Sequence, residues 1–351
     1  MKITFFTYQS VMFVHGGPHV KILALQQALQ KLGVQVSLFD MWADRDRALD
    51  ADLFQVFAAN LAVYDFARKL HERNVPYVVN PIFYTRRSWP VVAAFSRLDR
   101  LTRRFLRGLW WDYGFTRDVC HWALGVWPNT RAEADLLHRG LGVAKEKMRV
   151  IPNGVSERFY HADPALFEKS YGMRDFILNV GHVGPDRKNV VRLVQALRQI
   201  DHPAVIIGRP IEGGETPAVR RLLESAPNIL WIEGLDHNSE LLASAYAACR
   251  VFVLPSKFET PGRAALEAAL AGANIVITPH GGTREYFQDM AEYVDPYSVE
   301  AIRRGILKAL EKPPIPALRE RIRQNYVWER VAQRLLEYYQ ELLGKAPAPF
   351  T

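Results

Sequence analysis

The sequence predicts an α/β protein of two domains, each built around a parallel sheet. Three observations support this: a length of 351 residues, an alternation of strand-like and helix-like segments, and the return of that alternation in the second half. A chain of this length exceeds one ordinary core and suits two domains of common size. Hydrophobic residues make up 49% of the chain and charged residues 23%, which is typical of a globular protein.

The first half alternates between the two segment types from its first residue. Apolar, strand-like segments occupy 1–8, 34–40, 52–59 and 75–80, and helical patterns occupy 19–33 and 61–74. Thr4, Thr7 and Gln9 interrupt the first apolar segment, and no small-residue cleavage site follows it. We therefore expect a buried first strand there and not a signal peptide.

The second half repeats the plan. Strand-like segments at 176–183, 203–208, 228–234, 250–255 and 274–280 alternate with helical patterns at 189–200, 218–226, 240–248 and 262–273. Two Rossmann-like domains follow from this repeat. We place the first domain at 1–160, with a returning helix at 328–344, and the second at 172–327, with a hinge within 153–171.

Composition limits the class of partner and the compartment. The 45 basic and 37 acidic residues give a net charge of +8, which favours an anionic partner such as a nucleotide, a lipid head group or nucleic acid. Cys120 and Cys249 lie far apart and form no CxxC pattern, which fits a reducing cytoplasm. No segment has the roughly 18 to 20 apolar residues that a membrane span requires.

Two glutamates eight residues apart stand out in the segment 254–278. Glu259 lies in a loop after a strand that ends at Pro255, and Glu267 lies inside the helix that begins near Pro261 or Gly262. Open α/β sheets bind ligands at the carboxyl ends of their strands. A helix N-terminus also favours phosphate, and Gly262 permits close approach of a ligand.

This Glu-x7-Glu segment, preceded by Pro-Ser and followed by Ala-x-x-Ala-Gly, resembles the donor site of the retaining glycosyltransferases of family 4, or glycosyl transferases group 1. The resemblance implies the GT-B fold, with two Rossmann-like domains facing across a cleft. It places Glu259 beside the donor sugar and Glu267 on the ribose hydroxyls. We extend the predicted donor site to the residues around the helix start, which are Thr260, Pro261, Gly262 and Arg263.

A second match covers 176–197 and resembles the segment with which this family grips the diphosphate. Lys188 and Asn189 fit the end of the pattern, whereas His182, after Gly181, stands where the family has an arginine. Arg187 is our candidate for the missing cation. Fixed cations at this place stabilise the negative charge that builds on the departing nucleotide diphosphate, without a metal.

The first domain carries weaker matches. Residues 126–160 resemble the family's Asn-Thr segment, helix and Pro-Asn-Gly-Val turn, and His15, Gly16 and Gly17 match a glycine loop that would face the donor. The family frequently has a histidine after the strand at 75–80, but this chain continues with Asn80 and Pro81. His15 and His19 are candidates for the missing sugar contact.

A basic segment at 88–117 predicts an amphipathic helix. Winding at about 100° per residue gathers one stripe of arginines and an adjacent stripe of apolar residues. The helix could lie on an anionic membrane surface, grip a phosphorylated acceptor, or pack its apolar side in the core. The stripes are Arg97, Arg100, Arg104 and Arg107, and Leu98, Leu101, Phe105 and Leu109.

The sequence and the resemblance therefore predict a retaining enzyme of cell-surface polysaccharide synthesis. It would move a sugar from a nucleotide diphosphate to a glycan or lipid-linked acceptor and would require no metal and no further cofactor. The family is thought to use a same-face displacement, in which Glu259 stabilises charge, and a nucleophilic role for Glu259 stays open. Asp44 to Asp46 and Asp50 to Asp52 match a metal-binding DxD pattern, but we expect solvated loops there.

Three alternatives stay open: a nucleotide-sugar epimerase, a phosphorylase of the same fold, or a nucleic-acid-binding protein. A phosphorylase needs a much longer chain, and an epimerase lacks the Glu-x7-Glu combination. The net charge of +8 motivates the nucleic-acid alternative. Because no recognition motif accompanies that charge, we expect no nucleic-acid partner. The expected location is the cytoplasm, with a peripheral position on the inner membrane face as the second possibility.

Overall fold

The computed structural model describes residues 1–13, 16–106 and 111–344 of the chain. They form two compact units, Met1–Gly154 together with the chain from Trp328 onward, and Val155–Val327. We placed the end of the first domain at residue 160, whereas the boundary between the units lies at Gly154. Phe159 and Phe167 are buried in the core of the second unit, so the segment around them belongs there.

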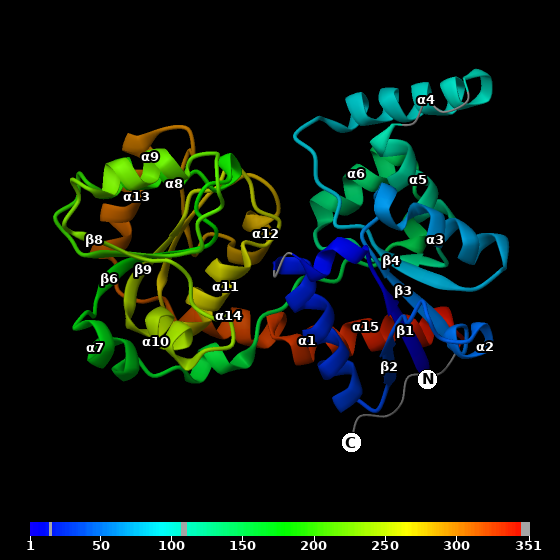
Figure 1. Cartoon of the computed structure of the whole chain (residues 1–351), viewed down its shortest axis with the longest axis horizontal. Coiled ribbons are helices and arrows are strands. Elements are labelled where there is room, and N and C mark those ends of the chain that lie inside the picture. The colour runs from blue at the N-terminus through cyan, green and yellow to red at the C-terminus, as the bar shows by residue number, and fades with distance from the viewer. Residues whose placement is uncertain (14–15, 107–110, 345–351) are drawn as a thin grey trace. The chain divides into compact units, whose positions relative to one another are not determined.

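The sheet of unit 1 has five parallel strands in the order β2-β1-β3-β4-β5 (Figure 1). Side chains of β3 alternate between two cores: Leu53 and Phe57 enter one, and Phe54 and Val56 enter the other. Burial of both faces explains why its strands read as nearly continuous apolar runs. The strands are β1 Lys2–Phe6, β2 Gln35–Leu38, β3 Leu53–Phe57, β4 Tyr77–Asn80 and β5 Gly125–Val126.

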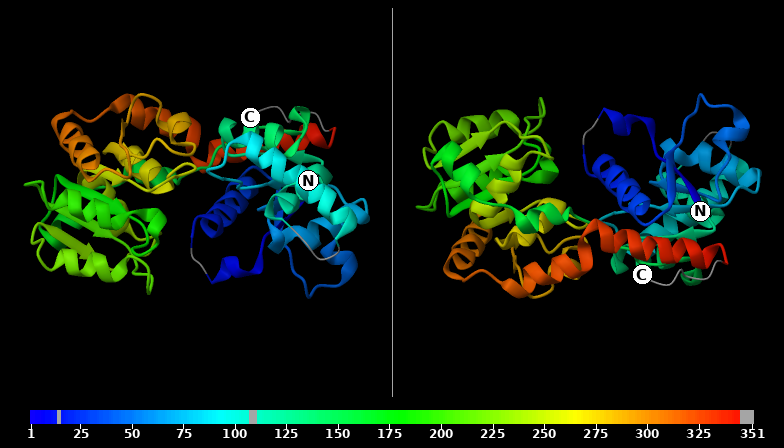
Figure 2. Two further views of the ribbon diagram at one scale, coloured as in Figure 1. Left: turned by 90° about the horizontal axis from the view of Figure 1, so that it is seen from above. Right: turned by 90° about the horizontal axis from the view of Figure 1, so that it is seen from below.

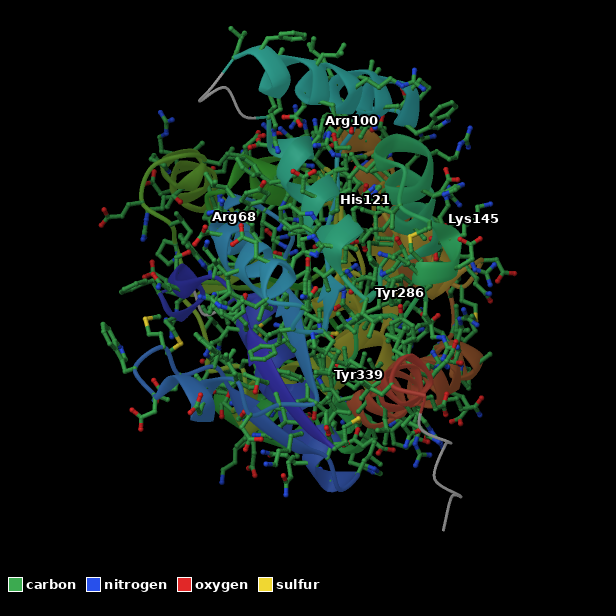
Figure 3. All side chains as sticks on the ribbon, turned by 90° about the vertical axis from the view of Figure 1, so that its right-hand side faces the viewer. Arg68, Arg100, His121, Lys145, Tyr286 and Tyr339 are labelled. Atoms are coloured by element: carbon green, nitrogen blue, oxygen red, sulfur yellow. The ribbon has the colours of Figure 1, made fainter. Side chains whose placement is uncertain are left out.

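Helices cover this sheet, and the last helix of the chain returns to it. Figure 2 shows α15, drawn in red, close to α1 of the same unit, as the contacts between the two helices require. Tyr339 on α15, labelled in Figure 3, donates its hydroxyl to Gln55 Oε1 on β3 at 2.8 Å. The helices are α1 Gly17–Lys31, α2 Arg45–Ala48, α3 Leu61–Glu72, α4 Trp89–Phe105, α5 Asp112–Trp122, α6 Arg131–Leu141 and α15 Trp328–Leu342, with short 3-10 turns at Gln9–Met12 and Lys145–Lys147.

The sheet of unit 2 has six parallel strands in the order β8-β7-β6-β9-β10-β11. In chain order this is the 3-2-1-4-5-6 arrangement of a Rossmann fold, in which the connections change direction between β6 and β9. The predicted α/β architecture is confirmed. The strands are β6 Phe176–Val180, β7 Ala204–Ile207, β8 Ile229–Ile232, β9 Cys249–Leu254, β10 Asn274–Ile277 and β11 Glu292–Tyr293.

Unit 2 contributes the remaining helices of the described chain, and they pack on both faces of its sheet. The two faces bury separate cores: Phe176 and Leu178 of β6 enter one, while Ile177 enters the other. The helices are α7 Ala165–Tyr171, α8 Val190–Leu197, α9 Thr216–Leu223, α10 Glu240–Ala248, α11 Arg263–Ala271, α12 Thr283–Phe287, α13 Val299–Glu311 and α14 Pro316–Tyr326, with 3-10 turns at Glu157–His161 and Asp186–Lys188.

Candidate active site

The loops that follow β6 and β9 meet at the switch point of unit 2. Asn189 joins them, because its buried side chain donates to the carbonyl oxygen of Pro255 at 2.8 Å and to that of Pro296 at 2.6 Å. Its backbone has a φ of +59°, which asparagine adopts at less cost than most residues. Ligands of open α/β sheets bind at such a point.

Glu259 is fixed there by the loop after β10. Its N–H donates to the carbonyl oxygen of His280 at 3.1 Å, and its own carbonyl oxygen accepts the N–H of Gly282 at 3.0 Å. Gly281 lies against this backbone with a φ of +97°, and a Cβ atom on it would stand 2.0 Å from the Glu259 carbonyl oxygen. Glycine at 281 therefore permits the approach that positions Glu259.

The Glu259 carboxylate, Arg187 and Lys188 form one cluster. Glu259 Oε1 accepts from Arg187 Nη1 at 2.9 Å and from Lys188 Nζ at 2.8 Å, and the Glu259 side chain is only 10% exposed. Burial by itself raises the pKa of Glu259, but the Lys188 and Arg187 cations outweigh it and hold the pKa below its usual value. The carboxylate is therefore ionised at neutral pH.

Glu267 lies in a separate cluster inside α11. Its Oε1 accepts from His237 Nε2 at 2.9 Å and lies 3.4 Å from Arg263 Nε, and its Oε2 accepts the hydroxyl of Tyr246 at 2.9 Å. Burial by itself raises the pKa of Glu267, but the hydrogen bond from His237 and the Arg263 charge outweigh burial, so that the pKa lies below its usual value. The carboxylate is buried, ionised and supported by three protein groups.

The other predicted donor-site residues surround these clusters. Gly262, with a φ of +70°, directly precedes α11, and no side chain caps this helix end. Thr260 and Pro261 lie in the loop before it, and Gly181 follows β6. Burial, with the Lys188, Arg209 and Arg187 charges, lowers the pKa of His182. A neutral His182 supplies no fixed cation where the family has arginine.

Sequence reasoning did not select His237, Tyr246 or Arg209. His237 lies between β8 and α10, Tyr246 on α10, and Arg209 just after β7. Each follows or precedes a predicted strand, but nothing in its local sequence indicates a partner. The carboxyl ends of neighbouring strands are the only signal that could have selected Arg209 and His237.

The predicted glycine loop belongs to unit 1. Gly16 precedes α1 and Gly17 begins it. His15 lies outside the described residues, and His19 lies in the first turn of α1. The prediction that this loop faces the donor stays a prediction.

The DxD-like segments have other surroundings. Asp50 pairs with Lys2 Nζ at 2.7 Å, and Asp52 Oδ2 accepts the N–H of Lys2 at 2.9 Å, so these carboxylates hold the start of β1. Asp46 lies in the first turn of α2. Within residues 1–13, 16–106 and 111–344, no three His, Cys, Asp or Glu side chains gather in a way that could hold a metal ion.

The predicted basic helix is α4, and its buried face differs from one of our expectations. Leu98 and Leu101 are 42% and 60% exposed, whereas Val92, Ser96 and Asp99 are buried. The alternative in which the apolar stripe packs in the core is therefore wrong for these two leucines. The polar Asp99 is buried because Arg103 and Arg117 pair with it, at 2.9 and 3.0 Å.

The arginine stripe of α4 is described only in part. Arg97 and Arg100 are exposed, and Figure 3 labels Arg100 on this helix. The side chain of Arg104 and the whole of Arg107 lie outside the described residues. Figure 1 shows α4 along the outer side of α5 and α6, against which it packs.

Comparison with known proteins identifies relatives of this chain. Residues 167–326 match the family described as glycosyl transferases group 1. The chain is 29% identical over 232 residues to the D-inositol 3-phosphate glycosyltransferase of Geodermatophilus obscurus, covering 60% of this chain and 51% of that protein. It is 30% identical over 155 residues to the O-antigen chain mannosyltransferase B of Escherichia coli, covering 42% of this chain and 40% of that protein. The chain thus spans about half the length of these relatives.

Solved structures share the whole fold. The sucrose-phosphate synthase of Thermosynechococcus elongatus superposes with a TM-score of 0.74 at 18% identity, covering 98% of this chain and 99% of that one. HepE of Anabaena, solved with UDP and glucose, superposes with a TM-score of 0.70 at 18% identity, covering 97% and 100%. At these identities the likeness concerns the fold alone.

Proposed function

We propose that the chain, whose residues 167–326 match the family described as glycosyl transferases group 1 and whose fold is GT-B as the sequence predicts, transfers a sugar from a nucleoside diphosphate to a glycan or lipid-linked acceptor. The match to this family and the glycosyltransferases among the relatives support the prediction of a glycosyltransferase enzyme. One observation carries the proposed reaction: Glu259, Arg187 and Lys188 converge at the switch point of unit 2.

The two clusters suit the two ends of a nucleotide sugar. Arg187 and Lys188 supply fixed positive charge for the diphosphate, and the uncapped N-terminus of α11 favours anions in addition. Glu267, held by His237 and Tyr246, would accept the ribose hydroxyls. HepE, which shares the fold, binds UDP and UDP-glucose, and this supports a nucleotide sugar as the donor.

Retention of the anomeric configuration and independence of metal complete the proposal. The leaving diphosphate takes the acceptor proton on the same face of the sugar, so no separate base is needed. Ionised Glu259 stabilises the positive charge that develops on the sugar ring. The Arg187 and Lys188 cations take the place that a metal ion has in other glycosyltransferases.

Nucleotide binding and product analysis test this function. We expect UDP, GDP or ADP to raise the melting temperature with increasing ligand concentration, as ligand linkage requires. Transfer should continue in EDTA and give a product with the donor's anomeric configuration by NMR. Failure of all three nucleotides to bind, an inverted product, or strict dependence on a divalent metal would each contradict the corresponding part of the proposal.

We further propose that α4 brings the enzyme to an anionic membrane that carries the acceptor. Leu98 and Leu101 present an exposed apolar stripe beside exposed Arg97 and Arg100, and the acidic Asp99 is buried and paired. Such a helix can rest on an anionic surface, where each basic side chain contributes about 1 kcal/mol. None of the described helices has the length and apolar character that crossing a membrane requires.

A charge-matched pair of variants tests the role of α4. Arg97→Gln with Arg100→Gln should weaken co-sedimentation with anionic vesicles and slow transfer to a lipid-linked acceptor. Arg221→Gln with Arg304→Gln removes the same charge from exposed positions of unit 2 and should change neither. Equal loss in both double variants would mean that net charge acts, and no loss in either would exclude the membrane role of this face.

A further inference from the structure

A buried polar cluster lies in unit 1, at the carboxyl edge of its sheet. Lys21 on α1 is 4% exposed, and its Nζ donates to Asn80 Oδ1 and to Asn129 Oδ1, both at 2.7 Å. The same ammonium lies 4.5 Å from the centre of the Trp127 ring. Asn80 ends β4 and Asn129 follows β5, so Lys21, on the helix after β1, joins the carboxyl ends of these two strands.

Glu133 extends this cluster to the loop after β4. Its side chain is buried, Oε1 accepts the N–H of Phe83 at 2.7 Å, and Oε2 accepts the N–H of Asn129 at 2.7 Å. Asn80 Nδ2 in turn donates to the carbonyl oxygen of Trp127 at 2.7 Å. The chain is therefore held at both ends of the short segment 80–83.

Between these two anchors the backbone is strained. Ile82 has a φ of +52°, in the left-handed region that β-branched residues rarely adopt. Such a conformation persists only where the surroundings determine it, and strained residues cluster at functional sites. The hydrogen bonds of Asn80 and Phe83 supply those surroundings.

We propose that Lys21 is a positioning residue, which acts through Asn80, Asn129 and Glu133 to hold the turn at Ile82 in one shape at the substrate-binding edge of unit 1. Carboxyl edges of open α/β sheets carry the ligand-binding loops, and the turn follows a strand at this edge. The inference rests on the proposed transfer reaction only where it concerns the effect of Lys21 on turnover. The strained backbone at Ile82 and the hydrogen bonds that hold it are features of the fold and do not depend on that reaction.

The chemistry of the cluster indicates that stability is not its purpose. Burial of an ammonium and a carboxylate carries a desolvation penalty that their attraction often fails to offset, and apolar replacements of equal volume are frequently as stable. Burial lowers the pKa of Lys21 to about 7, against the opposing charge of Glu133, and burial raises the pKa of Glu133. A costly cluster that fixes a strained turn fits a positioning role.

Lys21→Met tests this role, because methionine fills similar volume without hydrogen-bond donors. We expect the amide of Phe83 to exchange with deuterium about tenfold faster or more, as the loss of one to two hydrogen bonds allows. Turnover should fall by a similar factor while UDP affinity stays unchanged, because UDP binding is assigned to unit 2. Lys31→Met, at an exposed position of the same helix, is the control and should change none of these values.

Ile82→Asn tests the strain independently, and its result stands even where Lys21→Met does not fold. Asparagine tolerates a positive φ, so this variant should melt above the wild type, by about 2 to 4 °C. Ile211→Asn, at an exposed isoleucine without positive φ, is the control and should not melt higher.

The outcomes separate the inference from the proposed function. Unchanged exchange of the Phe83 amide in a folded Lys21→Met protein, or a melting temperature of Ile82→Asn no higher than that of its control, would overturn the positioning role. A wild-type protein that transfers no sugar would instead refute the proposed function, while deuterium exchange and melting would still decide the role of Lys21.

Discussion

Replacing Glu259 by glutamine separates the charge of this side chain from its shape. In the wild type, one carboxylate oxygen neutralises two cations, Arg187 at 2.9 Å and Lys188 at 2.8 Å. Under the proposed function, a nucleoside diphosphate shares these cations with Glu259 and lies close to its negative charge. At about 6 Å and an effective dielectric constant of 20, that repulsion is about 3 kcal/mol.

We therefore expect opposite effects of Glu259→Gln on binding and on turnover. If solvent screening reduces this repulsion by half, its removal in Glu259→Gln should let UDP bind about tenfold more tightly, since about 1.4 kcal/mol corresponds to a factor of ten. Turnover should fall tenfold to a hundredfold, because a charge-assisted interaction worth about 1.5 to 3 kcal/mol is missing when positive charge develops on the sugar.

Titration calorimetry with UDP and initial-rate kinetics measure the two effects. Glu300→Gln is a matched control, because Glu300 also pairs with an arginine of unit 2 but lies exposed on α13. Weaker UDP binding together with unchanged turnover in Glu259→Gln would refute the reasoning, since it would make Glu259 a support for the cations and not a competitor.

Three further predictions concern Glu267, Gly281 and Lys21. Glu267→Gln keeps the shape of the side chain and should weaken UDP binding about tenfold in calorimetry, with little change in turnover, through loss of charge-assisted bonds. Gly281→Ala should destabilise unit 2 by about 2 kcal/mol or more in urea unfolding, because its methyl group would collide with the Glu259 backbone. The pKa of Lys21 is about 7 in the folded protein, against an ordinary value of 10.5. Between these two pH values Lys21 is therefore protonated in the unfolded chain and largely deprotonated in the folded one. The stability of the wild type relative to Lys21→Met should therefore rise from pH 7 to pH 9, by up to about 1.4 kcal/mol per pH unit in thermal unfolding.

The strands, and the loop and helix that carry Glu259 and Glu267, could be predicted because their signals are local. Apolar runs separated by helical patterns indicate parallel strands, and β6 and β9 lie where those runs are. Glu259 and Lys188 were assigned from a motif resemblance, and the structure brings the two together at 2.8 Å. His237 and Tyr246 could not be assigned, because their contacts with Glu267 depend on how α10 and the loop before it pack beside α11.

The orientation of α4 shows a different limit. Its period is helical, and the sequence predicts the helix and its two stripes. The buried face is nevertheless set by Asp99, which reaches across to Arg117 of α5. A pattern of apolar residues cannot reveal such a pair, because a paired aspartate can enter the interior while leucines stay exposed. Leu98 and Leu101 are exposed for this reason.

Both carboxylates of the proposed donor site already accept hydrogen bonds from the protein's own donors, and this limits how the site can bind a nucleotide sugar. Glu259 holds Arg187 and Lys188, and Glu267 holds His237 and Tyr246. Binding of the diphosphate and the ribose is therefore an exchange of partners, in which only the difference between old and new interactions appears as affinity. A ligand that carries both a diphosphate and a ribose can replace the lost interactions at both clusters, whereas free phosphate or free ribose replaces them at one cluster only. We therefore expect the association constant of the complete nucleoside diphosphate to exceed the product of the association constants of free phosphate and free ribose.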